Sequence, residues 1–250
     1  MDTRRATSFG AWAHEYDLSR PSYPNAAVDW LVPSWAGCVV EAGAGTGKLT
    51  DRLVERGGLD LVVTEIDGRM LEVISRRYPA LTTFTTGVSA LPARDSSVDA
   101  VLVGDAWHWF PKEEAAAEVA RVLRPGGWLG CLWNDMVPTA DWQWKAVRLD
   151  PTIAASIESR SPRDRLGLSF GHAVQRRFRW TWMLTPEQWR SYVATVSHVR
   201  TLPEDECRAA LDETERLAAD ACAASGDPVV PLVYDTVCVR WHPASPIPME

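Results

Sequence analysis

The stretch Val39 to Thr50, VVEAGAGTGKLT, constrains the fold of this chain more than any other feature. It begins with apolar, β-branched residues typical of a buried strand and continues into a glycine-rich turn and a helix-like pattern. Glycine permits backbone turns that other residues avoid, and it lets a ligand lie directly on the main chain. The stretch therefore predicts a strand, a turn and a helix that form one end of a ligand site.

Two common phosphate-binding turns fit this stretch poorly. The P-loop pattern needs a glycine and a hydroxyl residue at the positions of Ala42 and Leu49. The dinucleotide pattern G-x-G-x-x-G fails at its third glycine, because Gly43 and Gly45 are followed by Lys48 at the required position. Neither a nucleoside triphosphate nor a dinucleotide is therefore the favoured ligand.

Two acidic residues indicate the charge of the ligand. Glu41 ends the strand before the turn, and Glu65 ends the next expected strand, 20 residues after Gly45. Ligands of open α/β sheets bind at the carboxyl ends of the strands, where an acidic residue at this spacing takes ribose hydroxyls. Glu41 would repel a pyrophosphate but attract a ligand with an ammonium and a sulfonium. S-adenosylmethionine carries both charges and a ribose, so we expect it as the cofactor.

The rest of the chain alternates strand-like runs with helical patterns, which is typical of a parallel sheet covered on both faces. We expect a doubly wound, mostly parallel, seven-stranded α/β sheet of the Rossmann-like type. The expected strands cover residues 38–41, 61–66, 82–87, 98–106, 128–134, 176–184 and 229–241. The expected helices cover residues 47–56, 68–78, 112–123, 186–196 and 204–225.

Composition and charge argue against several classes of protein. The chain has 250 residues, 46% apolar and 24% charged, which fits a single domain over residues 1–250. No apolar run suits a membrane span or a secretory signal, so we expect a cytoplasmic protein without a membrane partner. Five scattered cysteines show no metal-ligand spacing, and we expect no metal. A net charge of -7 without a basic cluster argues against nucleic acid.

Several motifs resemble those of the class I S-adenosylmethionine-dependent methyltransferases of the small-molecule type. EAGAGTG (41–47) is similar to the first motif of that family, and TEIDGRML (64–71) to its second. TGVSALPARDSSVDAVLVGDAWHWF (86–110) resembles the third and fourth motifs, especially in a subgroup that includes trans-aconitate methyltransferase-like proteins. RVLRPGGWL (121–129) is similar to the turn that precedes a strand in the family. The resemblance extends over nearly the full chain.

The resemblance implies where the cofactor would bind. Glu65 is expected on the ribose, with Ile66 and Met70 beside the adenine. The pair Val88 and Ser89 stands where Ala-Glu or Asp-Ala is common in the family. The expected cofactor-binding residues, besides two in the N-terminal segment, are Glu41, Gly43, Gly45, Gly47, Glu65, Ile66, Met70, Val88, Ser89 and Gly104.

Two segments are expected to close over the site. FGAWAHEYDLSRPSYP (9–24) also resembles the subgroup, in which it folds over the cofactor, so residues 1–24 are expected to form a lid. In this lid Tyr16 and Arg20 could contact the cofactor carboxylate or an acidic substrate, or be ordinary surface residues. The pattern of residues 135–175 is irregular, and residues 135–180 are expected to cover the substrate with one or two helices. The protein is expected to be a monomer or a homodimer.

The acceptor pocket is expected near the end of the strand over residues 98–106. His108 is the leading candidate for a general base, with Asp105 or His14 behind it, although a lone histidine is more often a core residue. The flanking tryptophans are expected to shield a partly buried, neutral imidazole. The expected substrate-lining residues are Tyr23, Trp107, Trp109 and Trp133.

The cofactor determines the expected chemistry. A sulfonium is already a strong electrophile, so the protein needs mainly to align the acceptor and exclude water. A hydroxyl or amine acceptor that carries a proton needs a base, whereas a carboxylate does not. We therefore expect methyl transfer by in-line displacement to a small molecule. Two alternatives stay open: a non-methylating member that only binds the cofactor, and a protein or RNA methyltransferase.

Overall fold

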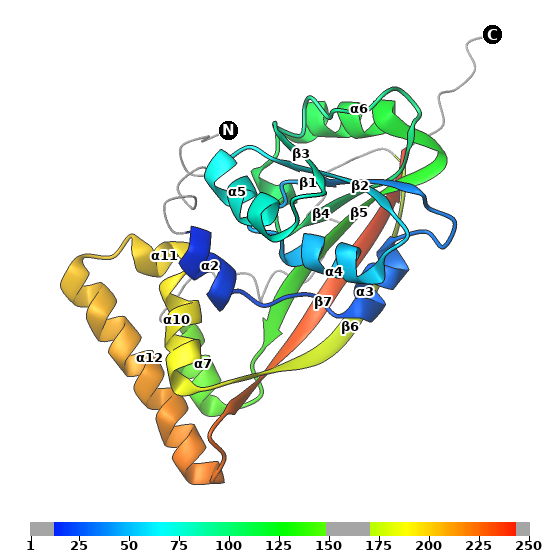
Figure 1. Cartoon of the computed structure of the whole chain (residues 1–250). Helices are drawn as coiled ribbons and strands as arrows, with labels where there is room; N and C mark the ends of the chain where they lie inside the picture. Colours follow the sequence, from blue (N-terminus) through cyan, green and yellow to red (C-terminus); the bar gives the residue numbers. More distant parts are fainter. Residues whose placement is uncertain (1–12, 149–170, 244–250) are drawn as a thin grey trace.

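The structure is a computed structural model, and it describes residues 13–148 and 171–243 (Figure 1). Its centre is a seven-stranded sheet in the order β3-β2-β1-β4-β5-β7-β6. Strands β1 to β5 are parallel, and β7 is antiparallel to both β5 and β6. The expected mostly parallel sheet is confirmed. The strands are β1 Cys38–Ala42, β2 Asp60–Glu65, β3 Thr82–Thr85, β4 Val98–Gly104, β5 Leu123–Val137, β6 His172–Leu184 and β7 Val230–His242.

Helices cover both faces of the sheet, as a doubly wound fold requires. The apolar sides of α3 (Asn25–Leu31), α4 (Lys48–Arg56) and α5 (Gly68–Arg77) join one buried cluster with β1, β2 and β4. The opposite face packs against α6 (Lys112–Val122), and Figure 1 shows these helices on the two sides of the sheet. In the described parts of the chain, no helix has both the length and the apolar character needed to cross a membrane.

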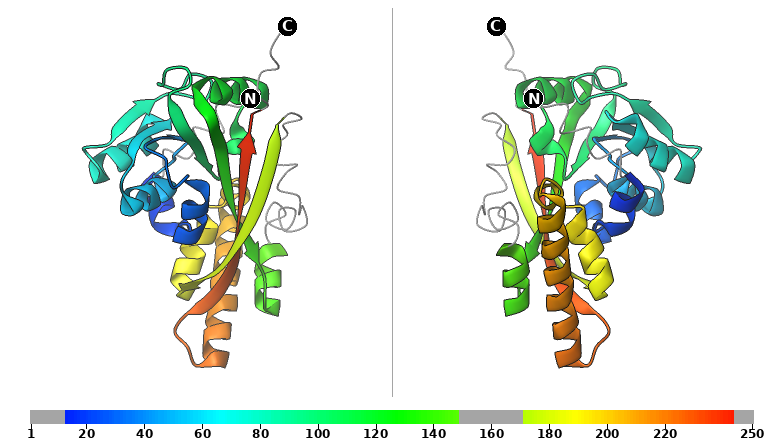
Figure 2. Two further views of the ribbon diagram at one scale, coloured as in Figure 1. Left: turned by 90° about the vertical axis from the view of Figure 1, so that its right-hand side faces the viewer. Right: turned by 90° about the vertical axis from the view of Figure 1, so that its left-hand side faces the viewer.

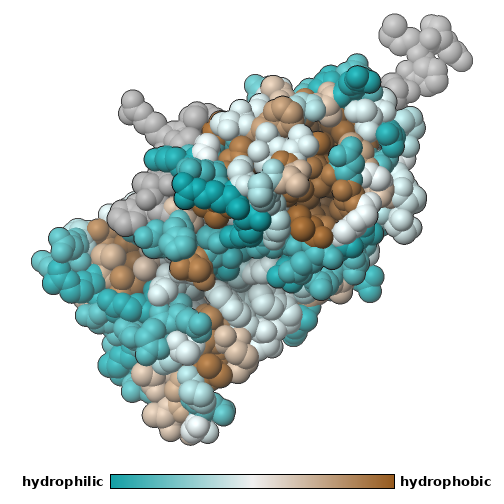
Figure 3. Space-filling view, viewed as in Figure 1, coloured by the Kyte–Doolittle hydropathy of each residue, from teal (hydrophilic) through white to brown (hydrophobic). Residues whose placement is uncertain are grey.

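The last three strands of the sheet extend beyond its parallel part and carry a separate group of helices. We call this group, with the strand ends on which it packs, the helical arm; Figure 2 shows it projecting from the sheet. A third buried cluster, which includes Trp189, Tyr192 and Tyr234, lies within it. Hydrophilic side chains cover much of its outer surface in Figure 3. The helices of the arm are α7 Asp141–Arg148, α10 Pro186–Ala194, α11 Ser197–Arg200 and α12 Glu204–Ser225.

The arm differs from the irregular segment expected over residues 135–175. Strand β5 continues to Val137 and β6 begins at His172, because both strands pair with β7. Val137 lies opposite Val233, and His172 lies opposite His242. The sequence of β6 did not indicate this start, since this edge strand exposes most of its side chains. Residues 149–170 of the expected covering segment and residues 1–12 of the expected lid lie outside the described residues.

Asp99 joins the beginnings of β1, β4 and β5, at the end of the sheet opposite the carboxyl ends of its parallel strands. Its side chain is buried, and Oδ2 accepts hydrogen bonds from the backbone N–H groups of Gly37 and Cys38, each at 2.8 Å. Oδ1 accepts a hydrogen bond from Arg124 at 2.7 Å. Burial raises the pKa of this carboxyl, but the backbone hydrogen bonds and Arg124 together hold it below its usual range. The carboxylate therefore fixes where β1 begins beside β4.

Replacing Asp99 with alanine is expected to lower the free energy of unfolding by about 2–4 kcal/mol, because two N–H groups and a guanidinium lose their acceptor. Urea unfolding at pH 7 measures this. The control is Asp95→Ala, whose exposed carboxylate pairs with Arg121 at the surface and should contribute less than about 1 kcal/mol. Because the pKa of Asp99 is lower in the folded protein than in the unfolded chain, its contribution to the free energy of unfolding should be fully present above about pH 4. This contribution should decline as pH falls through the folded pKa. Equal stabilities of the two variants would contradict this role.

Candidate active site

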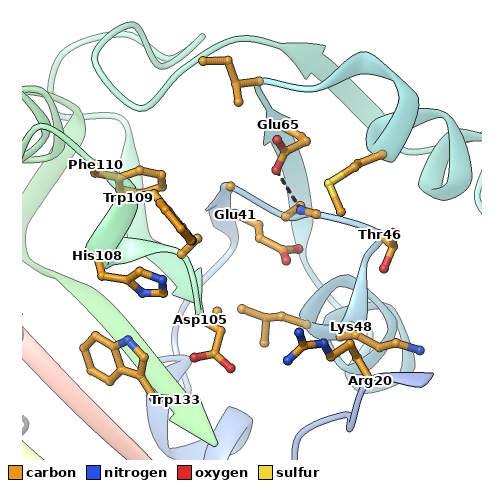
Figure 4. Close-up of a pocket in the computed structure, with 18 of the residues that line it drawn as sticks. Arg20, Glu41, Thr46, Lys48, Glu65, Asp105, His108, Trp109, Phe110 and Trp133 are labelled. Atoms are coloured by element: carbon orange, nitrogen blue, oxygen red, sulfur yellow. Dashed lines mark hydrogen bonds between the residues drawn. The ribbon is translucent and has the colours of Figure 1, made fainter. Parts of the chain in front are cut away.

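A cavity of about 830 Å³ lies at the carboxyl ends of β1, β2 and β4. Strand β1 has β2 on one side and β4 on the other, so the winding of the sheet reverses here. Open α/β sheets bind their ligands at this point of reversal. The walls come from these strand ends, from α2 (Ala13–Ser19) with the residues after it, and from the helical arm. Figure 4 labels Glu41, Glu65 and Asp105 at the strand ends and Arg20 after α2.

The glycine turn forms one wall of the cavity. Gly43 has a φ of +68°, and a Cβ there would lie 2.8 Å from the ring of Phe110. Gly45, with a φ of +59°, also lines the cavity. Gly47 does not line it, although it was expected to bind the cofactor. It caps α4 with a φ of +97°, and a Cβ there would meet Ile74 at 2.9 Å, so its role is conformational.

The Glu65 carboxylate connects the end of β2 to the glycine turn. It is almost fully buried, and Oε2 accepts a hydrogen bond from the N–H of Gly45 at 2.8 Å. Its Oε1 accepts one from the N–H of Asp67 at 3.0 Å. Burial raises its pKa, although the backbone hydrogen bonds oppose this effect. Each oxygen keeps the capacity to accept a further hydrogen bond from a ligand.

The Glu41 carboxylate lies in the same cavity, as its place at the end of β1 predicted (Figure 4). It is 1% exposed, and Oε2 accepts a hydrogen bond from the Thr50 hydroxyl at 2.7 Å. Burial raises the pKa of Glu41 to about 8, against the opposing effect of the Thr50 hydrogen bond. A positively charged ligand would favour the ionised form.

Near Glu65 the cavity has a mostly apolar lining. Ile66, Met70, Val88 and Ser89 all line the cavity, as expected. Sequence reasoning missed Thr46, whose buried Oγ1 has no hydrogen-bond partner in the described chain. A buried hydroxyl in a ligand cavity needs a partner, which a bound polar group can supply.

The end of β4 forms the floor of the cavity. Asp105 follows Gly104 with a φ of +52°, an uncommon conformation for a residue other than glycine, and its N–H donates to the carbonyl of Leu132 at 2.9 Å. A Cβ on Gly104 would lie 3.0 Å from the Tyr23 hydroxyl, so the glycine allows Tyr23 to pack on this strand end. Gly104, Asp105 and Tyr23 all line the cavity, as expected.

His108 belongs to the one-turn 3₁₀ helix Trp107–Trp109, which follows β4. Both His108 and Trp109 line the cavity, with ring centroids 4.8 Å apart. Trp107 does not: it is fully buried and packs edge-on against Phe110, which corrects its expected place in the acceptor pocket. Successive side chains of a 3₁₀ helix point about 120° apart, so only two of the three can face the cavity. For the same reason His108 is exposed rather than enclosed by two tryptophans.

An ion-pair network holds α2 against the sheet half of the molecule. The buried Asp17 carboxylate pairs with Lys48 Nζ at 3.3 Å and with the guanidinium of Arg77. Arg77 also pairs with Asp51 of α4 at 2.7 Å. The network joins α2 to α4 and α5, and it places Tyr16 and Arg20 at the cavity wall.

The helical arm supplies a wall that sequence reasoning missed. Trp133 lines the cavity as expected, but Tyr192 and Tyr234 were not expected there. Tyr234 reaches the cavity through the pairing of β5 with β7, in which it lies opposite Met136, and Tyr192 comes from α10, which packs in the same buried cluster. No local pattern relates residues so far apart in the sequence. The other lining residues from this side are Asn134, Asp135 and Val196.

Comparisons with known sequences agree with this geometry. Residues 40–131 match the methyltransferase domain family. The chain is 40% identical over 233 residues to an uncharacterized methyltransferase of Mycobacterium tuberculosis, which covers 93% of this chain and 94% of the relative. It is 29% identical over 231 residues to an uncharacterized methyltransferase-like protein of Schizosaccharomyces pombe, covering 89% and 90% of the two chains.

Solved structures share the fold. A protein of Anaeromyxobacter dehalogenans, provisionally described as a type II methyltransferase, matches with a TM-score of 0.65 and 23% identity over 91% of this chain and 99% of that one. Phosphoethanolamine N-methyltransferase 2 of Haemonchus contortus, solved with S-adenosylmethionine, matches with a TM-score of 0.55 and 12% identity over 96% of this chain and 60% of that one. The sequence matches extend over most of the chain, and carboxylates lie in the cavity at the ends of β1 and β2. The chain therefore belongs to the class I S-adenosylmethionine-dependent methyltransferases.

Proposed function

We propose that this protein transfers the methyl group of S-adenosylmethionine to a small-molecule acceptor. The observation that carries the proposal is that one cavity joins the Glu41 and Glu65 carboxylates to aromatic side chains: Trp109 after β4, Trp133 of β5, and Tyr192 and Tyr234 of the helical arm. Small-molecule pockets measure about 300–1,000 Å³, and this cavity, at about 830 Å³, has the size for a cofactor beside a small acceptor.

The residues at the strand ends fit the cofactor. Glu65 would accept hydrogen bonds from the ribose hydroxyls, because two backbone N–H groups already orient its carboxylate. Ile66, Met70 and Val88 offer apolar contacts for the adenine. The buried Thr46 hydroxyl, which has no partner in the described chain, would find one in a polar ligand. Glu41 would attract the positive charge of the cofactor.

In this proposal the protein orients the acceptor, excludes water from it and removes its proton. When bound, S-adenosylmethionine supplies an activated methyl group on a sulfonium. The aromatic side chains of Tyr23, Trp109 and Trp133 would hold the acceptor and limit the water around it. His108 and Asp105, beside them at the end of β4, are the candidates to receive a proton from a hydroxyl or an amine.

Glu65→Ala is expected to weaken binding of S-adenosylmethionine by about 1–3 kcal/mol, the usual scale for losing a hydrogen bond to a charged group. Calorimetric titration measures this. Glu72→Ala is the matched control, because this exposed carboxylate of α5 pairs with Arg76 at the surface, away from the cavity. The same titration with NAD or ATP should give no binding. An unchanged affinity in a folded Glu65 variant would remove Glu65 from the ribose role.

The lid segment over residues 13–24 is expected to exchange its amide hydrogens more slowly when cofactor is bound, because α2 lines the cavity. Asp17→Asn should speed exchange in this segment about tenfold or more, since it breaks a buried ion pair to α4 and α5. Asp29→Asn, which removes an exposed pair with Arg56, is the control. Equal protection with and without cofactor would make α2 a fixed part of the fold.

His108→Ala is expected to lower turnover by about 10²- to 10⁴-fold if the acceptor is a hydroxyl or an amine, while cofactor affinity changes little. A panel of small carboxylic acids, alcohols and amines with methyl-labelled cofactor tests both the acceptor class and the residue. His172→Ala, on the exposed edge strand β6, is the control. Full turnover by the His108 variant at every pH would indicate an acceptor that needs no base. Label found only in protein or RNA would overturn the proposed function.

A further inference from the structure

Arg20 has unusual surroundings for a cation that lines a cavity. Its Cζ lies 4.8 Å from the ring centroid of Tyr16 and 5.5 Å from that of Tyr192. Its Nη2 donates a hydrogen bond to the carbonyl of Thr195 at 2.8 Å, whereas its buried Nε has no hydrogen-bond partner in the described chain. Lys48, by contrast, is already paired with Asp17. Among residues 13–148 and 171–243, no carboxylate lies within ion-pairing distance of Arg20.

These contacts direct Arg20 to the acceptor side of the cavity. Tyr192 lies in α10 and Thr195 caps the end of that helix, so both belong to the helical arm rather than to the glycine turn. Tyr234 of β7 lines the same wall. Figure 4 shows the Arg20 guanidinium directed into the cavity, towards Asp105. In Figure 4 the Glu65 carboxylate lies farther from Arg20 than Asp105 does.

The surrounding hydroxyls are hydrogen-bond donors. Burial raises the pKa of Tyr16, and it raises that of Tyr234 well above the usual range, so both stay protonated at physiological pH. Burial lowers the pKa of Arg20, but electrostatic interactions with its surroundings, Asp105 among them, outweigh that effect, so the pKa is raised and Arg20 stays charged. A cation in aromatic surroundings without a carboxylate partner is costly, and an anionic ligand would offset that cost.

We infer that Arg20, with Tyr16, Tyr192 and Tyr234, forms a binding site for an anionic group of the methyl acceptor, such as a carboxylate. This inference rests on the proposed function and adds the charge of the substrate to it. A guanidinium binds a planar carboxylate through paired N–H groups, and the tyrosine hydroxyls donate further hydrogen bonds to it. The tyrosine rings offer contacts for the adjoining part of the molecule. Asp105 would repel the anion, so the anionic end would lie at Arg20 and another part of the acceptor near His108.

The experiment uses the full chain saturated with S-adenosylhomocysteine and titrates it calorimetrically with benzoate and with benzamide, its neutral analogue of similar shape. We expect benzoate to bind at least tenfold more tightly than benzamide. Arg20→Gln should weaken benzoate binding by about 10- to 100-fold and leave benzamide unchanged, since only the charge-assisted contact is lost. Arg216→Gln removes the same charge from the exposed α12 and should have no effect.

A second variant keeps the test decisive if Arg20→Gln fails to fold. Tyr192→Phe removes one hydroxyl and preserves the ring, and it should weaken benzoate binding by about 3- to 10-fold without affecting benzamide. Equal binding of benzoate and benzamide to the wild type would overturn the inference. The inference would also be overturned if Arg20→Gln bound benzoate in preference to benzamide as strongly as the wild type does. If only Tyr192→Phe folds, the same result in that variant would overturn it.

The remaining outcomes separate the acceptor from the cofactor. S-adenosylhomocysteine has an amino-acid carboxylate that 5′-methylthioadenosine lacks. If Arg20→Gln weakens binding of S-adenosylhomocysteine tenfold and leaves binding of 5′-methylthioadenosine unchanged, Arg20 contacts the cofactor carboxylate and the inference is wrong. If S-adenosylhomocysteine fails to bind the wild-type protein, the proposed function itself fails. Unchanged affinity for both nucleosides, together with the loss of benzoate binding, supports the anionic acceptor.

Discussion

The Glu65 carboxylate holds together the two strand ends on which the rest of the site is built. One oxygen accepts the N–H of Gly45 in the turn after β1, and the other accepts the N–H of Asp67 at the start of α5. Parallel strands bring their carboxyl ends to one edge of the sheet, but the turns that follow them still need to be fixed. By connecting both turns, this buried acidic residue gives the cavity its shape.

Two parts of the fold form the cavity in different ways. The parallel half supplies the glycine turn and two carboxylates through local motifs in which each residue follows the end of a strand. The helical arm supplies aromatic side chains through the antiparallel pairing of β5 with β7 and the packing of α10. This division agrees with a common cofactor site beside a more variable acceptor site, because the arm could change its lining without altering the strand ends.

The α2 helix connects the two parts. Asp17 pairs with Lys48 and Arg77 in the parallel half, and Arg20 contacts Tyr192 and Thr195 in the arm. Asn134 adds a hydrogen bond to the carbonyl of Ser22 at 3.0 Å, which ties the segment after α2 to β5. A single short helix and the residues after it thus contact both the parallel half and the helical arm beside the cavity.

The sequence by itself determined the parallel sheet, the glycine turn and the place of Glu41 and Glu65, because these follow from the local alternation of strands and helices and from residues at strand ends. Only the tertiary structure decided that Trp107 turns into the core while His108 and Trp109 face the cavity, since that depends on the 3₁₀ turn after β4. It also decided that Tyr192 and Tyr234 join Arg20, because contacts between residues so distant in the sequence arise from strand pairing and helix packing, which no local pattern records.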